Sequence, residues 1–128
     1  MTDAQASSRG WVAVALWLAL QVTLTSLPGK AIPVALPHPL DWAGHCGLYG
    51  GLGALIARAA ALRRWPLHRL VWTGVLLSAW GALDELHQLF IPGRAAEVSD
   101  WMSDTLGASL GLLVGTRVMA SRLARWLR

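Results

Sequence analysis

The chain has 128 residues, of which 55% are hydrophobic and 14% are charged, and its formal net charge at pH 7 is +4. A soluble domain of this size carries about 25% charged residues, so the composition excludes an ordinary soluble globular protein and predicts one small integral membrane domain over residues 1–128. The single cysteine, Cys46, excludes an intramolecular disulfide and a cysteine-cluster metal site.

Apolar runs separated by polar or proline-rich segments predict an all-α bundle of four transmembrane helices. A short polar tail, residues 1–10, precedes the first helix, and we favour a retained helix over a cleaved signal peptide because no small-residue cleavage pattern follows it. Four prolines and a glycine in residues 28–40 predict an extended connector. We expect the helices at about residues 11–27, 42–62, 67–91 and 99–123.

The distribution of charge predicts how the bundle is oriented. If the helices alternate in direction, nine of the 11 basic residues fall on the side of the two termini, which the positive-inside rule places in the cytoplasm. Anionic lipid accounts for these basic residues, so nucleic acid is not an expected partner. Six of the seven acidic residues fall on the opposite side. We therefore expect a site on the extracytoplasmic face of the cytoplasmic (inner) membrane.

The second predicted helix carries one polar stripe, because Asp41, His45 and Tyr49 recur every four residues. A buried histidine in an apolar helix needs a polar partner, which favours a functional role for His45. Asp41 has two readings, as a helix cap or as a chemical group. Tyr49 is interpreted first as a packing or hydrogen-bonding residue.

The third predicted helix ends in a polar block, and an isolated arginine follows it. In helical projection Asp84 and Gln88 lie close together, whereas Glu85 and His87 lie on opposite flanks, so the four side chains cannot all reach one atom. Arg94 is the isolated arginine. It is a candidate for binding an anion or for neutralising an acid of the next helix.

The fourth predicted helix carries two aspartates above a stripe of glycines. Asp100 and Asp104 share a face with Gly107, Gly111 and Gly115. A glycine face in a membrane helix normally packs against protein, so both carboxylates should point into the bundle. Carboxylates in that position are functional candidates or partners of a cation.

Together these motifs resemble the VanZ-like family of small bacterial membrane proteins, named for a protein associated with teicoplanin resistance. The resemblance implies a four-helix membrane protein of the cell envelope that acts on lipid-linked head groups, with a link to glycopeptide antibiotic resistance. It covers the chain from Asp41 to Gly115 and implicates Asp41, His45, Glu85, Gln88, Arg94, Asp100 and Asp104. Two positions depart from the family pattern: Trp42 stands where a lysine is common, and Asp104 stands where many members have asparagine.

The residues and the resemblance predict head-group or phosphoryl transfer, or hydrolysis, on a membrane lipid or polyprenyl phosphate at the outer leaflet. His45, oriented by Asp41 or by a carboxylate of the third helix, would deprotonate the attacking water or alcohol, or attack directly. Asp100 and Asp104 would position the arginine, protonate the leaving group or, with Glu85, bind Mg²⁺ or Mn²⁺.

Substrate binding is assigned to a second set of side chains. Arg94 would hold phosphate oxygens in a bidentate manner. The other candidates for substrate binding are Gln88, Tyr49, Asp84 and His87.

Two functions from other classes stay open. One is a non-catalytic envelope protein that binds lipid or glycopeptide and needs no general base. The other is a small transporter acting as an oligomer, which is less expected because the carboxylates cluster at one end of the helices and not at the bilayer midplane. The sequence leaves the oligomeric state open.

Overall fold

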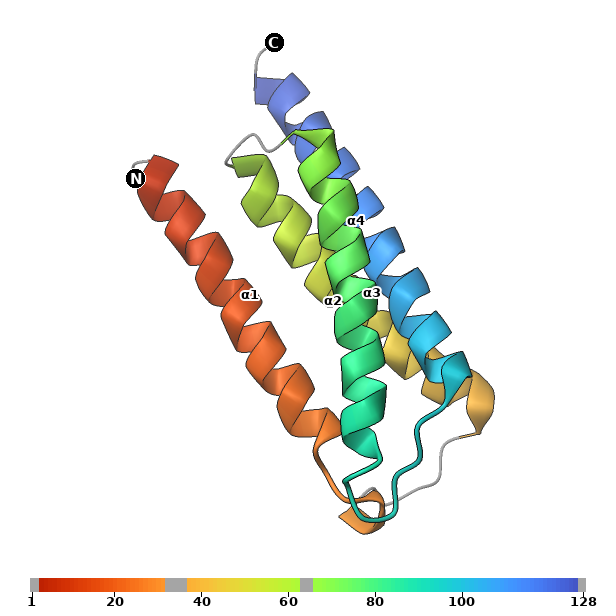
Figure 1. The fold of residues 1–128 in the computed structure, drawn as a ribbon. Helices are drawn as coiled ribbons and strands as arrows, with labels where there is room; N and C mark the ends of the chain where they lie inside the picture. The colour runs from red at the N-terminus through yellow and green to blue at the C-terminus, as the bar shows by residue number, and fades with distance from the viewer. Residues whose placement is uncertain (1–2, 32–36, 63–65, 127–128) are drawn as a thin grey trace.

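The computed structural model describes residues 3–31, 37–62 and 66–126. Four long helices account for most of these residues, and no β-strand occurs among them (Figure 1). The helices are α1 (Asp3–Thr25), α2 (His38–Leu62), α3 (Leu67–Gln88) and α4 (Val98–Trp126), with a short 3₁₀ helix, η1 (Gly29–Ala31), after α1. The predicted all-α fold of four helices is confirmed. Both termini lie at one end of the bundle, and the α1–α2 and α3–α4 connections lie at the other.

Several helix boundaries differ from the expected ones. α1 begins at Asp3, so residues 3–10, which were expected to precede the first helix, are helical, since the alanine, glutamine and arginine among them are good helix formers. α2 begins at His38 with Pro39 in its first turn, where proline is tolerated because its missing N–H would have no helical acceptor. α3 ends at Gln88 and continues only as turns. Residues 32–36 of the predicted connector lie outside the described residues.

Helices α2 and α4 form the central contact of the bundle, and glycines make that contact close. A Cβ built on Gly107 would meet the backbone carbonyl of Cys46, and one on Gly111 would meet the backbone carbonyl of Gly50. Gly115 meets α2 in the same way, one turn further on. Each step of four residues along α4 matches a step of four along α2, so the two helices run parallel and in register.

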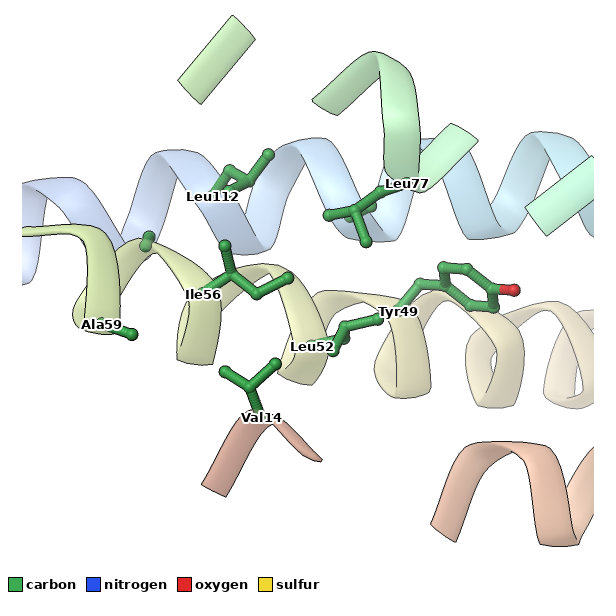
Figure 2. Packing of buried hydrophobic residues seen from close by; sticks show 9 residues of the cluster. Val14, Tyr49, Leu52, Ile56, Ala59, Leu77 and Leu112 are labelled. Atoms are coloured by element: carbon green, nitrogen blue, oxygen red, sulfur yellow. The ribbon is translucent and has the colours of Figure 1, made fainter. Parts of the chain in front are cut away.

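The apolar core lies around the middle of α2. Figure 2 shows Leu52 and Ile56 of α2 between Val14 of α1, Leu77 of α3 and Leu112 of α4. These side chains are less than 9% exposed. The core therefore joins all four helices through α2.

Two polar contacts tie the outer helices to this pair. The indole Nε1 of Trp17 in α1 donates to the Leu48 carbonyl in α2, at 2.8 Å. The hydroxyls of Ser78 in α3 and Thr105 in α4 lie 2.9 Å apart. Each contact satisfies a polar group that would be costly to leave unpaired in an apolar setting.

The bundle exposes many large apolar side chains and buries several polar ones, which is the reverse of the usual pattern in soluble proteins. Large apolar side chains are exposed on the outward faces of α1, α3 and α4, among them Leu16 (67%), Trp72 (65%) and Leu106 (57%). The buried polar residues are Gln21, Thr25, Asp84, Glu85, Gln88, Asp100 and Asp104. Among the described residues, no helix combines the length and the apolar character that a membrane crossing requires. The predicted transmembrane character stays a prediction.

The close contact of α2 and α4 predicts a position-dependent effect of adding one methyl group. Gly107→Ala should lower the free energy of unfolding by about 1–3 kcal/mol, because the methyl group meets backbone that cannot rotate away. Gly47→Ala is the matched control, since nothing lies within 4 Å of its added Cβ, and it should change stability by less than about 0.5 kcal/mol or raise it. Denaturant titration of the purified variants, followed by circular dichroism, measures both values, and equal losses in the two variants would contradict the packing.

Candidate active site

The candidate site lies at the end of the bundle that carries the α1–α2 and α3–α4 connections (Figure 1). The first turns of α2 and α4 and the last turns of α3 meet there. Because α2 and α4 are parallel and in register, the polar stripe that includes His45 lies against the face of α4 that carries Asp100 and Asp104. The predicted inward orientation of both aspartates is confirmed, since they are 5% and 0% exposed.

His45 is held between these two carboxylates. Its Nδ1 lies 2.9 Å from Oδ1 of Asp104, and its Nε2 lies 3.7 Å from Oδ2 of Asp100. An ionised carboxylate only accepts hydrogen bonds, so Nδ1–H is the donor in the shorter contact. The 3.7 Å separation is too long for a hydrogen bond. In the neutral ring the lone pair of Nε2 therefore faces the Asp100 side.

Tyr49 and Asp84 connect α2 to α3 beneath the histidine. The Tyr49 hydroxyl donates to Oδ2 of Asp84 at 3.4 Å, and the tyrosine is 1% exposed. The interpretation of Tyr49 as a packing and hydrogen-bonding residue is confirmed by this contact. Asp84 in turn has a neutral partner inside the bundle.

Glu85 fixes the segment that leads into α4. Its Oε2 accepts the backbone N–H of Glu97 at 2.9 Å, and its Oε1 accepts a longer bond, 3.4 Å, from Nε2 of Gln88. The Glu97 side chain is exposed, as expected for a solvated loop charge, but its backbone amide is part of the site's support. Both oxygens of Glu85 are thus engaged in structural contacts.

Asp41 and Asp100 occupy equivalent places in two parallel helices. Each lies in the first turn of its helix, α2 or α4, where the positive end of the helix dipole stabilises a carboxylate. Asp41, His45 and Asp100 place one ligand atom each within 4.8 Å of the others, and His45, Glu85 and Asp104 do the same. Either group has the atoms to hold a metal ion.

Two of the predicted substrate-binding residues lie apart from this cluster. Arg94 donates from Nη2 to the Leu24 carbonyl near the end of α1, at 3.4 Å, and within the described residues it hydrogen-bonds to no acid. His87 points outwards and is exposed. The structure brings together Asp41, His45, Tyr49, Asp84, Glu85, Gln88, Asp100 and Asp104.

Gln21 on α1 is a buried polar residue that the sequence analysis did not select. It is 1% exposed, and its side-chain amide interacts with the hydroxyl of Tyr49 in α2. A lone amide in an apolar run was the available signal, since polar groups in such runs are seldom there without a reason. α1 thus contributes a polar group to an interior that sequence reasoning assigned to the other three helices.

Two open grooves lie outside this cluster. One of about 740 Å³ runs between α1, α2 and α4 on the side of the termini, and another of about 530 Å³ runs between α3 and α4. Both are lined mainly by apolar side chains. The ionisable side chains gather around His45 and not in either of these two grooves.

The contacts of Glu85 predict a local effect of its removal. Glu85→Ala should accelerate hydrogen exchange at the Glu97 amide by about 10- to 100-fold, because that N–H loses its acceptor. Glu97→Ala keeps the backbone N–H and its acceptor, so exchange should stay close to that of the parent protein. Mass spectrometry of the segment 89–97 measures the exchange rate in both variants. An equal acceleration in the two would contradict the hydrogen bond from the Glu97 amide to Glu85.

Neither the comparison with curated proteins nor that with solved structures gives a significant match. The sequence profile of the VanZ/LLP1 family matches residues 8–119, a span that contains every residue of the cluster. That match extends over most of the chain and agrees with the resemblance expected from the polar motifs. The chain belongs to the VanZ/LLP1 family.

Proposed function

We propose that this protein is a membrane-embedded hydrolase or transferase that acts on the phosphate head group of a membrane lipid or of a polyprenyl phosphate. The observation that carries the proposal is His45, held by Asp104 through Nδ1 with Nε2 directed towards Asp100. This arrangement orients an imidazole as an enzyme site requires, with one nitrogen fixed and the other available.

The distribution of apolar and polar side chains supports a location in the membrane. Residues such as Leu76 (67%) and Val114 (55%) expose large apolar groups on the outside, and monomeric soluble proteins rarely carry apolar surface that extends over several helices. Four acids, Asp84, Glu85, Asp100 and Asp104, are buried inside the bundle, and small residues pack α2 against α4. Small residues at helix contacts and polar groups facing protein are typical of membrane bundles.

The arrangement of the chain ends supports an extracytoplasmic site. Both termini lie at one end, and the His45 cluster lies at the other (Figure 1). Most basic residues belong to the end with the termini, which the positive-inside rule assigns to the cytoplasm. The cluster would then face the outer leaflet, where lipid-linked head groups are available.

The chemistry of the cluster suits displacement at phosphorus. A water or an acceptor alcohol would lose its proton to Nε2 of His45, and its oxygen would attack phosphorus. An ion bound by the residues of this cluster would instead supply the activation by lowering the pKa of the water that it binds. The bond from phosphorus to the leaving oxygen would break, and the proton taken from the nucleophile would return to that oxygen through a nearby carboxyl group. The first turns of two parallel helices favour an anionic group at this end.

The orientation predicts opposite labelling of two exposed positions. In a background with Cys46→Ala, which removes the native thiol, Phe90→Cys should react with a membrane-impermeant maleimide in intact cells, whereas Ser121→Cys should not. Phe90 is 83% exposed near the site, and Ser121 is exposed near the C-terminus. Inverted membrane vesicles should give the reverse pattern. Equal labelling of both positions, or loss of the protein from carbonate-washed membranes, would contradict the proposed location.

The role of His45 predicts a large loss of turnover. His45→Ala should lower the rate by about 100-fold or more, the usual contribution of a positioned acid–base group. His87→Ala is the matched control, since it removes an exposed histidine from the same end of the bundle, and its rate should stay within about twofold of the parent value. Purified protein in liposomes with radiolabelled phospholipid or polyprenyl phosphate provides the assay.

The same assay decides between catalysis and binding. If no substrate of either kind is turned over, but lipid still binds and Arg94→Ala weakens that binding while His45→Ala does not, the protein is a non-catalytic lipid-binding protein. Full turnover in His45→Ala would contradict the catalytic proposal outright.

A further inference from the structure

The charges of the site do not balance among the contacts that the structure describes. Asp84, Glu85, Asp100 and Asp104 are each no more than 7% exposed, and the ion pairs of these acids have one potentially cationic partner, His45. Arg94, the nearest arginine in sequence, hydrogen-bonds to α1 instead. Buried carboxylates without a cation are costly, and they would repel an anionic phosphate.

The carboxylate of Asp100 is the group whose surroundings point to a bound cation. Asp100 is 5% exposed, and its Oδ1 is buried with no hydrogen-bond partner among the described residues. Its other oxygen, Oδ2, lies 3.7 Å from Nε2 of His45, beyond hydrogen-bond range. Two ligand atoms on one zinc-sized ion lie about 3–3.4 Å apart, given bonds of about 2 Å to each. The separation is close to what a shared ion needs.

Two groups of residues could bind the ion: Asp41, His45 and Asp100, or His45, Glu85 and Asp104. They differ in how many of their ligand atoms already accept hydrogen bonds. Glu85 already accepts two hydrogen bonds, one of them from the loop that begins α4. Asp41 is half-buried in the first turn of α2, and with His45 and Asp100 it places ligand atoms within 4.8 Å of one another. The group of Asp41, His45 and Asp100 is therefore better suited to an ion than the group with Glu85.

Asp104 completes the arrangement from the other side of the imidazole. It accepts the Nδ1–H of His45 at 2.9 Å, which leaves Nε2 as the nitrogen with a lone pair. A carboxylate that fixes a histidine in this way is the usual support behind a histidine ligand of a metal.

We propose that Asp41, His45 and Asp100 bind one divalent transition-metal ion, with Asp104 positioning His45. One imidazole and two carboxylates suit Mn²⁺ or Zn²⁺ better than Mg²⁺, which prefers oxygen ligands. The ion would balance the buried carboxylate of Asp100 and the half-buried one of Asp41, and it would give a phosphate oxygen a cation to bind. This inference deepens the proposed function by naming the group that activates the nucleophile, but ion binding does not require that the lipid substrate be known.

The test uses the purified full-length chain in detergent, stripped with a chelator and titrated with Mn²⁺ under electron paramagnetic resonance, and with Zn²⁺ by calorimetry. We expect one ion per chain. His45→Ala and Asp100→Asn should each raise the dissociation constant at least tenfold, and Asp104→Asn should raise it about 10- to 100-fold. The matched controls are His87→Ala and Glu97→Gln, exposed groups at the same end of the bundle, which should leave the dissociation constant unchanged.

Two results would overturn the inference: no stoichiometric binding of either ion, or an unchanged dissociation constant in Asp100→Asn. If that variant loses its helical circular dichroism, Asp41→Asn replaces it, because Asp41 is half-buried at a helix start. Ion binding without lipid turnover would leave the inference standing and contradict the proposed function. Turnover that survives chelation would contradict the inference alone.

Discussion

The close, parallel contact of α2 and α4 is the constraint on which the rest of the structure depends. Gly107 and Gly111 allow the α4 backbone to approach Cys46 and Gly50 of α2, and any larger residue at these places would push the helices apart. This contact sets the register of the two helices. The register in turn sets the distances from the imidazole of His45, in α2, to Asp100 and Asp104, in α4.

The interior of the bundle is built for polar groups at one end and for apolar packing along the middle. Leu52 and Ile56 fill the centre, while the acids gather where α2 and α4 begin and α3 ends. Such an interior needs partners for its buried charges inside the protein, because large apolar side chains are exposed on the outer faces of the helices. The proposed membrane location, the candidate histidine site and the proposed ion are all inferred from this one distribution of side chains.

Apolar runs were sufficient to predict the four helices, and the spacing of polar residues was sufficient to predict which helical faces of α2 and α4 form the site. The spacing of four in Asp41, His45 and the Asp100–Asp104 pair places each set on one helical face, and the structure brings those faces together. Periodicity could not place Arg94, because its position depends on a turn after α3 that bonds to the end of α1. Nor could it find Gln21 or the backbone amide of Glu97, whose roles come from tertiary contacts.

The most direct test of the account is the position of the proton on His45. Nitrogen NMR of the protein in lipid, with ¹⁵N-labelled histidine and the resonance assigned through His45→Ala, observes Nδ1 and Nε2 separately. In the ion-free protein we predict a protonated Nδ1 whose shift changes in Asp104→Asn and stays the same in Asp84→Asn, because Asp104, and not Asp84, hydrogen-bonds to that nitrogen. A ring protonated at Nε2 alone, and insensitive to Asp104, would contradict the site.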